Sequence, residues 1–328
     1  MIYLILFFIS FILTYVIKIY AIKKSLIAKV NDRSSHTTPT PHGGGIAIAI
    51  AWFIGIIYFY INMQIESNLF YALLMGVVIS IVSYFDDLYE LSPKLRIVVQ
   101  SSVAIGAIIV LGGLNTLELG LFSIENQIIT NLFAFLMIVW FINLYNFLDG
   151  IDGYAGSEAL FLAIAGLVLF GGQHFIVLIV SVLGFLIWNW HKAHIFMGDV
   201  GSTLLGYNIA VFTIYYSNQE STNLWVWIIL FGLFWFDATL TLLRRYKNGE
   251  KLSEAHRKHA YQRLTQSGWS HDRVTIYSMV VNIFLFSLVY FVSKNICSCI
   301  SNIIVAFLIA LILLYSLVRL VDKQNKFN

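Results

Sequence analysis

Charged side chains are scarce in this sequence. Asp, Glu, Lys and Arg make up 11% of its 328 residues, while 59% are hydrophobic. A soluble domain of this size carries about a quarter charged residues, so the scarcity excludes an ordinary soluble protein. Cysteine is almost absent: Cys297 and Cys299 have too few ligands around them for a zinc site, and a disulfide between such near neighbours would be strained. We interpret both cysteines as structural or incidental, and no nucleic-acid partner is expected.

Apolar runs recur from one end of the chain to the other, and each can cross a bilayer of ~30 Å. The first, residues 1–21, lacks the basic start and the cleavage site of a signal peptide, and is therefore expected to be a retained anchor. The expected spans are 1–21, 45–62, 68–85, 96–112, 127–145, 157–173, 174–190, 200–217, 223–243, 273–293 and 299–319. The sequence thus predicts an all-α fold: a polytopic membrane helical bundle of eleven transmembrane helices, with residues 1–328 in one domain.

The basic residues give the orientation. If the N-terminus lies outside, on the periplasmic side, then Lys294 alone of the 20 lysines and arginines falls on the outer side. The positive-inside rule favours that arrangement, which makes the C-terminus cytoplasmic. The cytoplasmic loops, expected to form the active site, are then 22–44, 86–95, 146–156, 191–199 and 244–272.

The stretch Asn143 to Gly153 closes a long apolar run with two carboxylates, Asp149 and Asp152. At helical spacing these acids share a face, so both can point with Asn146 at one spot. Glycines 150 and 153 break the helix there and let a ligand approach the backbone. The alternative is an ordinary acidic loop at the end of a membrane helix.

Two further segments place acids at the inner surface. Asp86 and Asp87 end the third span, where adjacent carboxylates repel each other unless something binds them; Mg²⁺ is the expected binder. The alternative is a solvated turn before Pro93. Asp199 stands between two glycines just before an apolar helix, a favourable position for a metal-binding acid, and Phe196 offers a flat surface for a base.

The first and last inner loops carry the remaining polar chemistry. The glycine run 43–45 opens the second span with exposed amides and suggests either a phosphate cradle or a rigid turn. The loop 244–272 groups histidines among its cations, which suggests an anionic substrate or anionic lipid headgroups. Asp237 lies deep in the ninth span, where an acid is expensive; a function and a buried hydrogen bond are equally consistent with it.

Together these segments resemble the polyprenyl-phosphate N-acetylaminosugar-1-phosphate transferases, the family of MraY and WecA. The resemblance covers nearly the whole chain and places five motifs in the family's order. They are Thr38-Pro-Thr-Pro-His-Gly-Gly, Phe85-Asp-Asp, Asn146-Phe-Leu-Asp-Gly-Ile-Asp-Gly, Phe196-Met-Gly-Asp-Val-Gly-Ser and His256-x-x-His259. The last loop looks most like the WbpL branch, which starts O-antigen-type glycans.

The resemblance implies a Mg²⁺-dependent enzyme, with Mn²⁺ as an alternative metal, in the inner membrane of a bacterium. It would transfer an N-acetylated aminosugar 1-phosphate from a UDP-N-acetylhexosamine, 6-deoxy sugars included, to undecaprenyl phosphate, releasing UMP. The product would initiate O-antigen, lipopolysaccharide or other cell-wall glycan synthesis. Its catalytic and metal-binding residues would be Asp86, Asp87 and Asp199.

The resemblance also assigns the substrate contacts. The prenyl tail would lie in an apolar groove around Asp86, among membrane lipids. The substrate-binding residues would be Asn146, Asp149 and Asp152 at the nucleotide, Phe196 on uracil, and His256, Arg257 and His259 at the diphosphate.

Two positions depart from the family pattern. MraY-type members have a lysine where this chain has Ser35, so Arg33 or His36 would have to substitute, and Lys258 takes the third place of WecA's His-x-His-His. Both departures argue against a muramoyl-pentapeptide substrate. The sugar, the one-step or aspartyl-phosphate mechanism and a homodimeric state are left open.

The sequence gives weaker support to two other functional classes. A membrane transporter would use the intramembrane Asp237, but transporters place ionisable groups near the midplane on several helices. A CDP-alcohol phosphatidyltransferase would need its acids spaced along one segment, and no segment of this sequence fits that pattern.

Overall fold

The computed structural model describes residues 1–24, 27–28, 39–120, 122–252, 254, 256–294 and 300–327. These described residues are mostly helical and include two short antiparallel strand pairs, β1 with β2 and β3 with β4. In chain order the elements are α1 (Ile2–Lys23), β1 (Ile27–Ala28), β2 (Thr40–Pro41), α2 (Gly45–Ile61), α3 (Ser67–Leu74), α4 (Gly76–Tyr89), α5 (Pro93–Leu111), β3 (Leu117–Glu118), β4 (Ser123–Ile124), α6 (Gln127–Phe147), α7 (Tyr154–Phe170), α8 (Gln173–Asn189), α9 (Asp199–Gln219), α10 (Asn223–Leu230), α11 (Gly232–Lys247), α12 (Ala260–Gln266), α13 (His271–Lys294) and α14 (Ile300–Gln324).

Each apolar run of the sequence coincides with a helix or a pair of helices. Two runs are broken: the third divides at Met75 into α3 and α4, and the ninth bends by 72° between α10 and α11. Among the described residues, 6 helices are long and apolar enough to cross a membrane, or 7 if the bent pair is one span. The chain is therefore a multi-pass membrane protein with an all-α fold. The count of eleven spans and the outside N-terminus remain predictions.

Helix α9 forms the centre of the bundle. Every residue from Val200 to Ser217 is buried, and the helix packs against α2, α4 and α6. Small residues permit this close packing, as is common between membrane helices. A Cβ added at Gly45 of α2 would lie 2.3 Å from the backbone nitrogen of Gly201, and one at Gly206 would lie 2.5 Å from the carbonyl oxygen of Phe141. The start of α9 is thus fixed against its neighbours.

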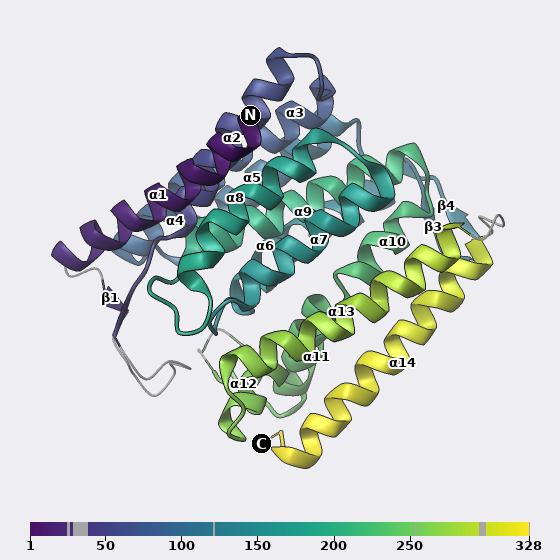
Figure 1. Ribbon diagram of the computed structural model, residues 1–328. Coiled ribbons are helices and arrows are strands. Elements are labelled where there is room, and N and C mark those ends of the chain that lie inside the picture. Colours follow the sequence, from purple (N-terminus) through teal and green to yellow (C-terminus); the bar gives the residue numbers. More distant parts are fainter. Residues whose placement is uncertain are drawn as a thin grey trace.

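The helices form two adjoining groups (Figure 1). Helices α1 to α9 make one bundle, and α10, α11, α13 and α14 lie along its flank with α12 at their lower end. Large apolar side chains remain exposed on the outer helices, for example Phe8, Ile109 and Ile312, as expected of a surface that faces lipid. The N-terminus and the end of α14 lie at opposite ends of the molecule.

The two ends of the bundle differ in their chemistry. At one end the β3–β4 hairpin packs against the start of α10, where Trp225 Nε1 donates to the carbonyl of Glu118 at 2.6 Å. At the other end α4 and α6 finish and α9 begins, and α12 lies at the same end of the neighbouring helices α13 and α14 (Figure 1). The predicted acid motifs all lie at this second end.

Candidate active site

Helix packing brings four of the predicted acids together with one amide. Asp86 and Asp87 lie in the last turn of α4, Asn146 lies in the last turn of α6, and Asp149 follows two residues after that helix ends. Asp199 is the first residue of α9. Because α9 packs against both α4 and α6, the ends of three helices meet here. We call these five residues the acid cluster.

Asp199 is fixed from the α6 side by Asn146. The Asn146 Nδ2 atom donates to Asp199 Oδ1 at 2.8 Å and to Ser202 Oγ at 3.0 Å. The carboxylate also sits at the N-terminus of a long helix, where the helix dipole favours negative charge. Asn146 therefore orients this carboxylate at the start of α9.

Asp87 approaches the same helix start from α4. Its Oδ1 atom accepts the backbone N–H of Asp199 at 3.2 Å. Its Oδ2 atom is buried, and no hydrogen-bond partner lies beside it in the part of the chain that the structure describes. Gly198, at φ +76°, leaves room for this oxygen. A side chain at position 198 would crowd it, because its Cβ would lie 3.0 Å from Asp87 Oδ2. A buried carboxylate oxygen without a donor is a position that a bound cation would satisfy.

Asp86 has a cationic partner that the sequence did not indicate. Its Oδ2 atom accepts from Arg96 Nη1 at 3.0 Å, and its Oδ1 atom accepts from the backbone N–H of Leu91 at 2.8 Å. A polar cavity of about 30 Å³ lies between Asp86, Arg96, Asn146 and Asp199. That volume holds one or two water molecules or a small ion. The sequence does place Arg96 in the first turn of α5, the helix that follows α4 after a short loop, and this position could have indicated the pair.

The acid cluster fits a hard divalent cation, although no metal site is preassembled. Among the described residues no three His, Cys, Asp or Glu side chains converge in metal-binding geometry. Mg²⁺ needs no such set, since it is usually bound by one or two carboxylates together with waters and substrate phosphates. The free Asp87 Oδ2 atom and the neighbouring Asp199 carboxylate supply oxygens of that kind. The residues present are therefore compatible with the predicted metal.

Asp149 is buried next to other carboxylates. Burial, and after it the negative charges of Asp199 and Asp87, raise the pKa of the Asp149 carboxyl to about 7 from its ordinary value of 3.8. These influences place Asp149 beside the other acids. A cation bound in the cluster would favour its ionised form.

Asp152 does not join Asp149, so the expectation of a shared helical face was wrong. Helix α6 ends at Phe147, and residues 148–153 follow as a turn in which the i, i+3 rule does not apply. The Asp152 Oδ2 atom instead lies 3.2 Å from His271 Nδ1 and accepts the backbone N–H of Ala193 at 3.2 Å. These contacts, against the cost of burial, hold the pKa of Asp152 below its ordinary value. Asp152 thus joins the α8–α9 loop to the start of α13.

The segment 256–261, here called the histidine loop, adjoins the acid cluster through Tyr261. The Tyr261 hydroxyl donates to the carbonyl of Phe147 at 3.1 Å, and its ring stacks on Tyr154 at 5.1 Å. The His259 ring stacks on Tyr261 with centroids 5.9 Å apart, and it lies tilted by 42° against His256 with centroids 4.9 Å apart. Arg257 lies between the two histidines in the chain and is half-buried. No pattern in the sequence indicated this contact of Tyr261.

Asp237 acts as the anchor of this loop. Both of its carboxylate oxygens accept the backbone N–H of Ala260 at 2.9 Å, and its Oδ1 lies 3.8 Å from His259 Nδ1. Thr241 Oγ1 donates to the same oxygen at 3.1 Å. Of the two interpretations left open, the buried hydrogen bond is the one that the geometry supports. It also fixes the histidine loop at Ala260.

The glycine-rich segment before α2 packs against the start of α9. Phe196 donates its backbone N–H to Pro41 at 2.8 Å and accepts that of Gly44 at 3.0 Å, while Gly45 donates to Met197 at 2.8 Å. The backbone N–H groups of Gly44 and Gly45 therefore already donate hydrogen bonds within the protein. This supports the interpretation as a rigid turn over that as a phosphate cradle. Phe196 is half-buried beside Asp199. Arg33 and His36, the predicted substitutes for the family lysine, lie outside the described residues.

The pKa values of two groups in the site are shifted in opposite directions. Burial, with His259 and Arg245, lowers the pKa of His256 to about 4 from 6.5, whereas that of Asp149 is raised to about 7. Between pH 3.8 and 7 the folded chain keeps the Asp149 proton that the unfolded chain releases, so Asp149 destabilises the fold as pH rises. Between pH 6.5 and 4 the unfolded chain binds a His256 proton that the folded chain refuses, so His256 destabilises it as pH falls.

The expected result is a pair of opposite difference curves in thermal unfolding of the detergent-solubilised protein. Relative to the wild type, Asp149→Asn gains stability as pH rises towards 7, and His256→Gln gains stability as pH falls towards 4. Difference curves that are flat across this range would show that neither group is perturbed.

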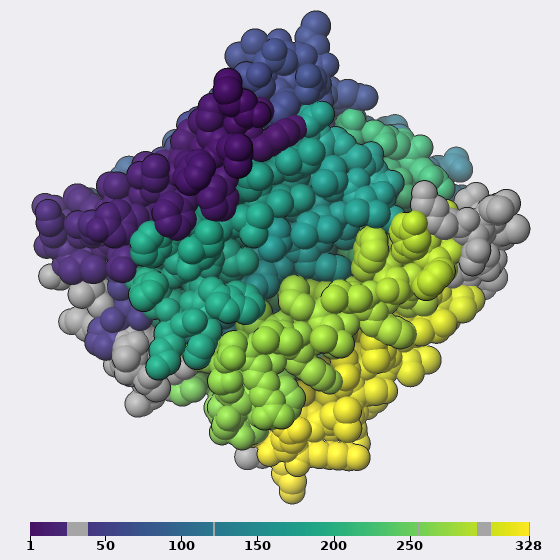
Figure 2. Space-filling model, viewed as in Figure 1, coloured from purple at the N-terminus to yellow at the C-terminus, as the bar shows by residue number. Residues whose placement is uncertain are grey.

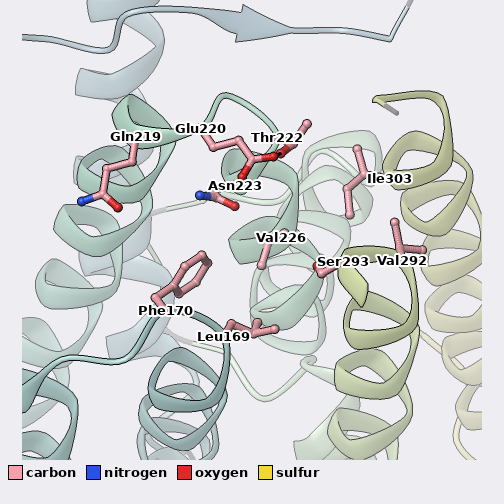
Figure 3. Close-up of a pocket in the computed structure, with 10 residues that line it drawn as sticks. All are labelled: Leu169, Phe170, Gln219, Glu220, Thr222, Asn223, Val226, Val292, Ser293 and Ile303. Atoms are coloured by element: carbon pink, nitrogen blue, oxygen red, sulfur yellow. Dashed lines mark hydrogen bonds between the residues drawn. The ribbon is translucent and has the colours of Figure 1, made fainter. Parts of the chain in front are cut away.

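A large, partly polar cavity lies at the opposite end of the bundle (Figure 3). It measures about 530 Å³, with Gln219, Glu220 and Asn223 above an apolar floor that includes Phe170 and Val226. None of its lining residues is a histidine or a cation. A pocket of this size is ordinarily the first candidate for a ligand site. Here the acid cluster and the histidine loop are the better candidate, because they combine buried acids, cations and aromatic rings.

The sequence is similar to known membrane transferases over most of its length. Residues 69–217 match the family model described as glycosyl transferase family 4. A Bacillus subtilis (strain 168) protein named probable undecaprenyl-phosphate N-acetylglucosaminyl 1-phosphate transferase is 33% identical, over 87% of this chain and 82% of its own length. A Mycobacterium leprae (strain TN) decaprenyl-phosphate N-acetylglucosaminephosphotransferase is 28% identical, over 82% and 77%. An Escherichia coli (strain K12) undecaprenyl-phosphate alpha-N-acetylglucosaminyl 1-phosphate transferase is 28% identical, over 76% and 71%.

Proposed function

Because the chain belongs to the polyprenyl-phosphate N-acetylaminosugar-1-phosphate transferase family, we propose that it transfers an N-acetylhexosamine 1-phosphate from a UDP-sugar to undecaprenyl phosphate. The observation that carries this proposal is the convergence of Asp87, Asp149 and Asp199 with the histidine loop at one end of a membrane bundle. N-acetylglucosamine is the first sugar to test, since the relatives are named for it, and 6-deoxy sugars follow. The product would begin a cell-envelope glycan such as O-antigen.

The reaction joins two anions, and this explains the composition of the site. An oxygen of the lipid phosphate forms a bond to the sugar-bearing phosphorus, and the bond from that phosphorus to the bridging oxygen breaks, so that UMP leaves. Mg²⁺ or Mn²⁺, held by Asp87 and Asp199 with Asp86 nearby, would neutralise phosphate charge. Asn146 keeps Asp199 oriented, and Arg96 holds Asp86 in place.

The remaining residues would position the nucleotide and its diphosphate. His256, Arg257 and His259 lie on a loop that closes against α6 and are proposed to contact the diphosphate. Phe196, three residues before α9, is proposed to stack on uracil. Asp149 would contact the nucleotide directly, whereas Asp152 would support the site through the α8–α9 loop.

The proposed setting is the inner membrane of a bacterium, with the acid cluster on the cytoplasmic side and the N-terminus outside. The positive-inside distribution of Lys and Arg supports this orientation. The transporter alternative loses its main support, because the Asp237 carboxylate is occupied by the backbone of Ala260.

The test is UMP release by the purified protein in vesicles. We expect release only when a UDP-N-acetylhexosamine, undecaprenyl phosphate and a divalent cation are all present, and loss of release with a chelator. Glu220→Gln, at the opposite end of the bundle, serves as the control and should match the wild type. Turnover of the UDP-sugar without lipid acceptor, or movement of substrate across the vesicle without chemistry, would contradict the proposal.

A further inference from the structure

The end of α14 binds the base of the histidine loop, although no sequence motif indicated it. Asp322 accepts two hydrogen bonds from Arg244, at 2.9 Å from Nη1 and 3.0 Å from Nη2. The same carboxylate accepts from Arg263 Nη1 at 2.7 Å. Arg244 lies in the last turn of α11 and Arg263 lies in α12. One carboxylate therefore joins three helices directly behind the loop.

The residues that follow Asp322 complete the enclosure. The ring of Phe327 lies beneath three cations, with its centroid 5.2 Å from Arg244 Cζ, 5.4 Å from Arg263 Cζ and 5.6 Å from Lys258 Nζ. These distances fall within the range of cation–π attraction. Asn325 accepts from Arg263 Nη1 at 2.9 Å through its carbonyl and donates through Nδ2 to the carbonyl of Arg263 at 3.3 Å. Figure 2 shows the α12 region in contact with the end of α14.

This anchoring is more than a surface ion pair, because Arg263 is buried. Its side chain is 3% exposed, and a buried guanidinium requires a close anionic partner. Helix α12 has 7 residues, too few to be stable without tertiary contacts. Its position is therefore determined from outside: Asp237 holds its first backbone amide, and Asp322 with Phe327 holds its far half.

We propose that Asp322 and Phe327 are positioning residues for the transfer reaction. They hold Arg244, Lys258 and Arg263 so that the histidine loop is presented to the acid cluster in a single arrangement. This inference rests on the proposed function. Neither residue touches the acid cluster, so both act through the loop and not on the substrate.

A purely structural role makes a different prediction. If the end of α14 only stabilised the fold, its variants would lose thermal stability while each folded molecule kept the wild-type Michaelis constants. A positioning role predicts a rise in the KM for the UDP-sugar with the KM for undecaprenyl phosphate unchanged. A small displacement of a binding loop reduces kcat/KM by up to about 100-fold, and we expect a reduction of about 10- to 100-fold here.

The experiment uses the whole chain in vesicles, four test variants and one control variant. Asp322→Asn removes the charge, and Asp322→Glu restores it on a longer side chain. Phe327→Ala removes the ring, and Phe327→Leu keeps an apolar side chain without a π face. Lys323→Gln changes an exposed charge on the same helix turn and is the matched control. Each variant is assayed for UMP release against both substrates. Hydrogen exchange is measured for the amides of α12, including Arg263, and for Ser267, which caps the end of the helix.

The expected result is faster α12 exchange and the UDP-sugar KM effect in Asp322→Asn, Phe327→Ala and Phe327→Leu. Asp322→Glu should recover much of the activity, and Lys323→Gln should behave as the wild type. Unchanged α12 exchange, or equal losses for both substrates, would overturn the inference. If Asp322→Asn does not fold, the two Phe327 variants decide the question. Absence of UMP release by the wild type would instead refute the proposed function, while the exchange measurement would still report on the anchoring.

Discussion

Replacing Asp199 by asparagine is expected to reduce UMP release by about 1000-fold, which is the range for losing one electrostatic group from a preorganised site. Asp199 occupies the N-terminus of the central helix, next to the Asp87 carboxylate and within reach of the Asn146 amide. Asparagine keeps the shape and can still accept from Asn146. The substitution therefore removes the charge that would bind the cation and leaves the packing intact. Initial rates at saturating cation, UDP-sugar and undecaprenyl phosphate measure the effect.

The same variant should fold almost as well as the wild type. It loses the favourable charge at the helix start, worth up to about 1 kcal/mol, but it also removes one of several crowded carboxylates. We expect thermal unfolding to change little, while the stabilisation that Mg²⁺ and UDP-sugar together give to the wild type disappears. Glu90→Gln is the control, since Glu90 is an exposed acid three residues beyond Asp87. An Asp199→Asn protein with more than a tenth of wild-type activity would remove Asp199 from the proposed catalytic set.

The helices themselves were predictable because burial in lipid leaves little choice of secondary structure. Apolar runs without proline must satisfy their backbone groups internally, so each run became a helix. The bend between α10 and α11 was not predictable. It falls at Phe231 and Gly232 inside an uninterrupted apolar run, and only packing against α13 and α14 distinguishes it from a straight span.

The acid cluster was predictable for a related reason. Acids at the end of an apolar run are costly, and three such runs carried them at the same surface. The partners of other acids at this end were not predictable, because they come from distant parts of the chain. Asp152 contacts His271, and Asp322 contacts Arg263. A pattern along one helix shows which residues need partners, and the fold decides which partners they meet.

Substituting Gly150 by alanine is the second large effect, and it tests how the acid motif meets the histidine loop. A Cβ at this position would lie 2.1 Å from the Tyr261 hydroxyl oxygen and 3.0 Å from Tyr261 Cζ. Tyr261 cannot easily yield, since its side chain is buried, stacks on Tyr154 and donates to the carbonyl of Phe147. The histidine loop must therefore move away from Asp149. We expect UMP release to fall by about 100-fold, as for a misplacement of about 1 Å in an active site.

A second substitution distinguishes this clash from a general weakening of the chain. Tyr261→Phe alone removes the hydroxyl and its hydrogen bond, which costs about 1 kcal/mol of stability and should reduce activity only modestly. In the double variant the clashing oxygen is gone, so Gly150→Ala with Tyr261→Phe should be more active than Gly150→Ala alone. Such a result is a non-additive coupling between two residues in contact. Additive losses in the double variant would show that glycine is required at 150 for its backbone, and that Tyr261 does not carry the contact between the motif and the loop.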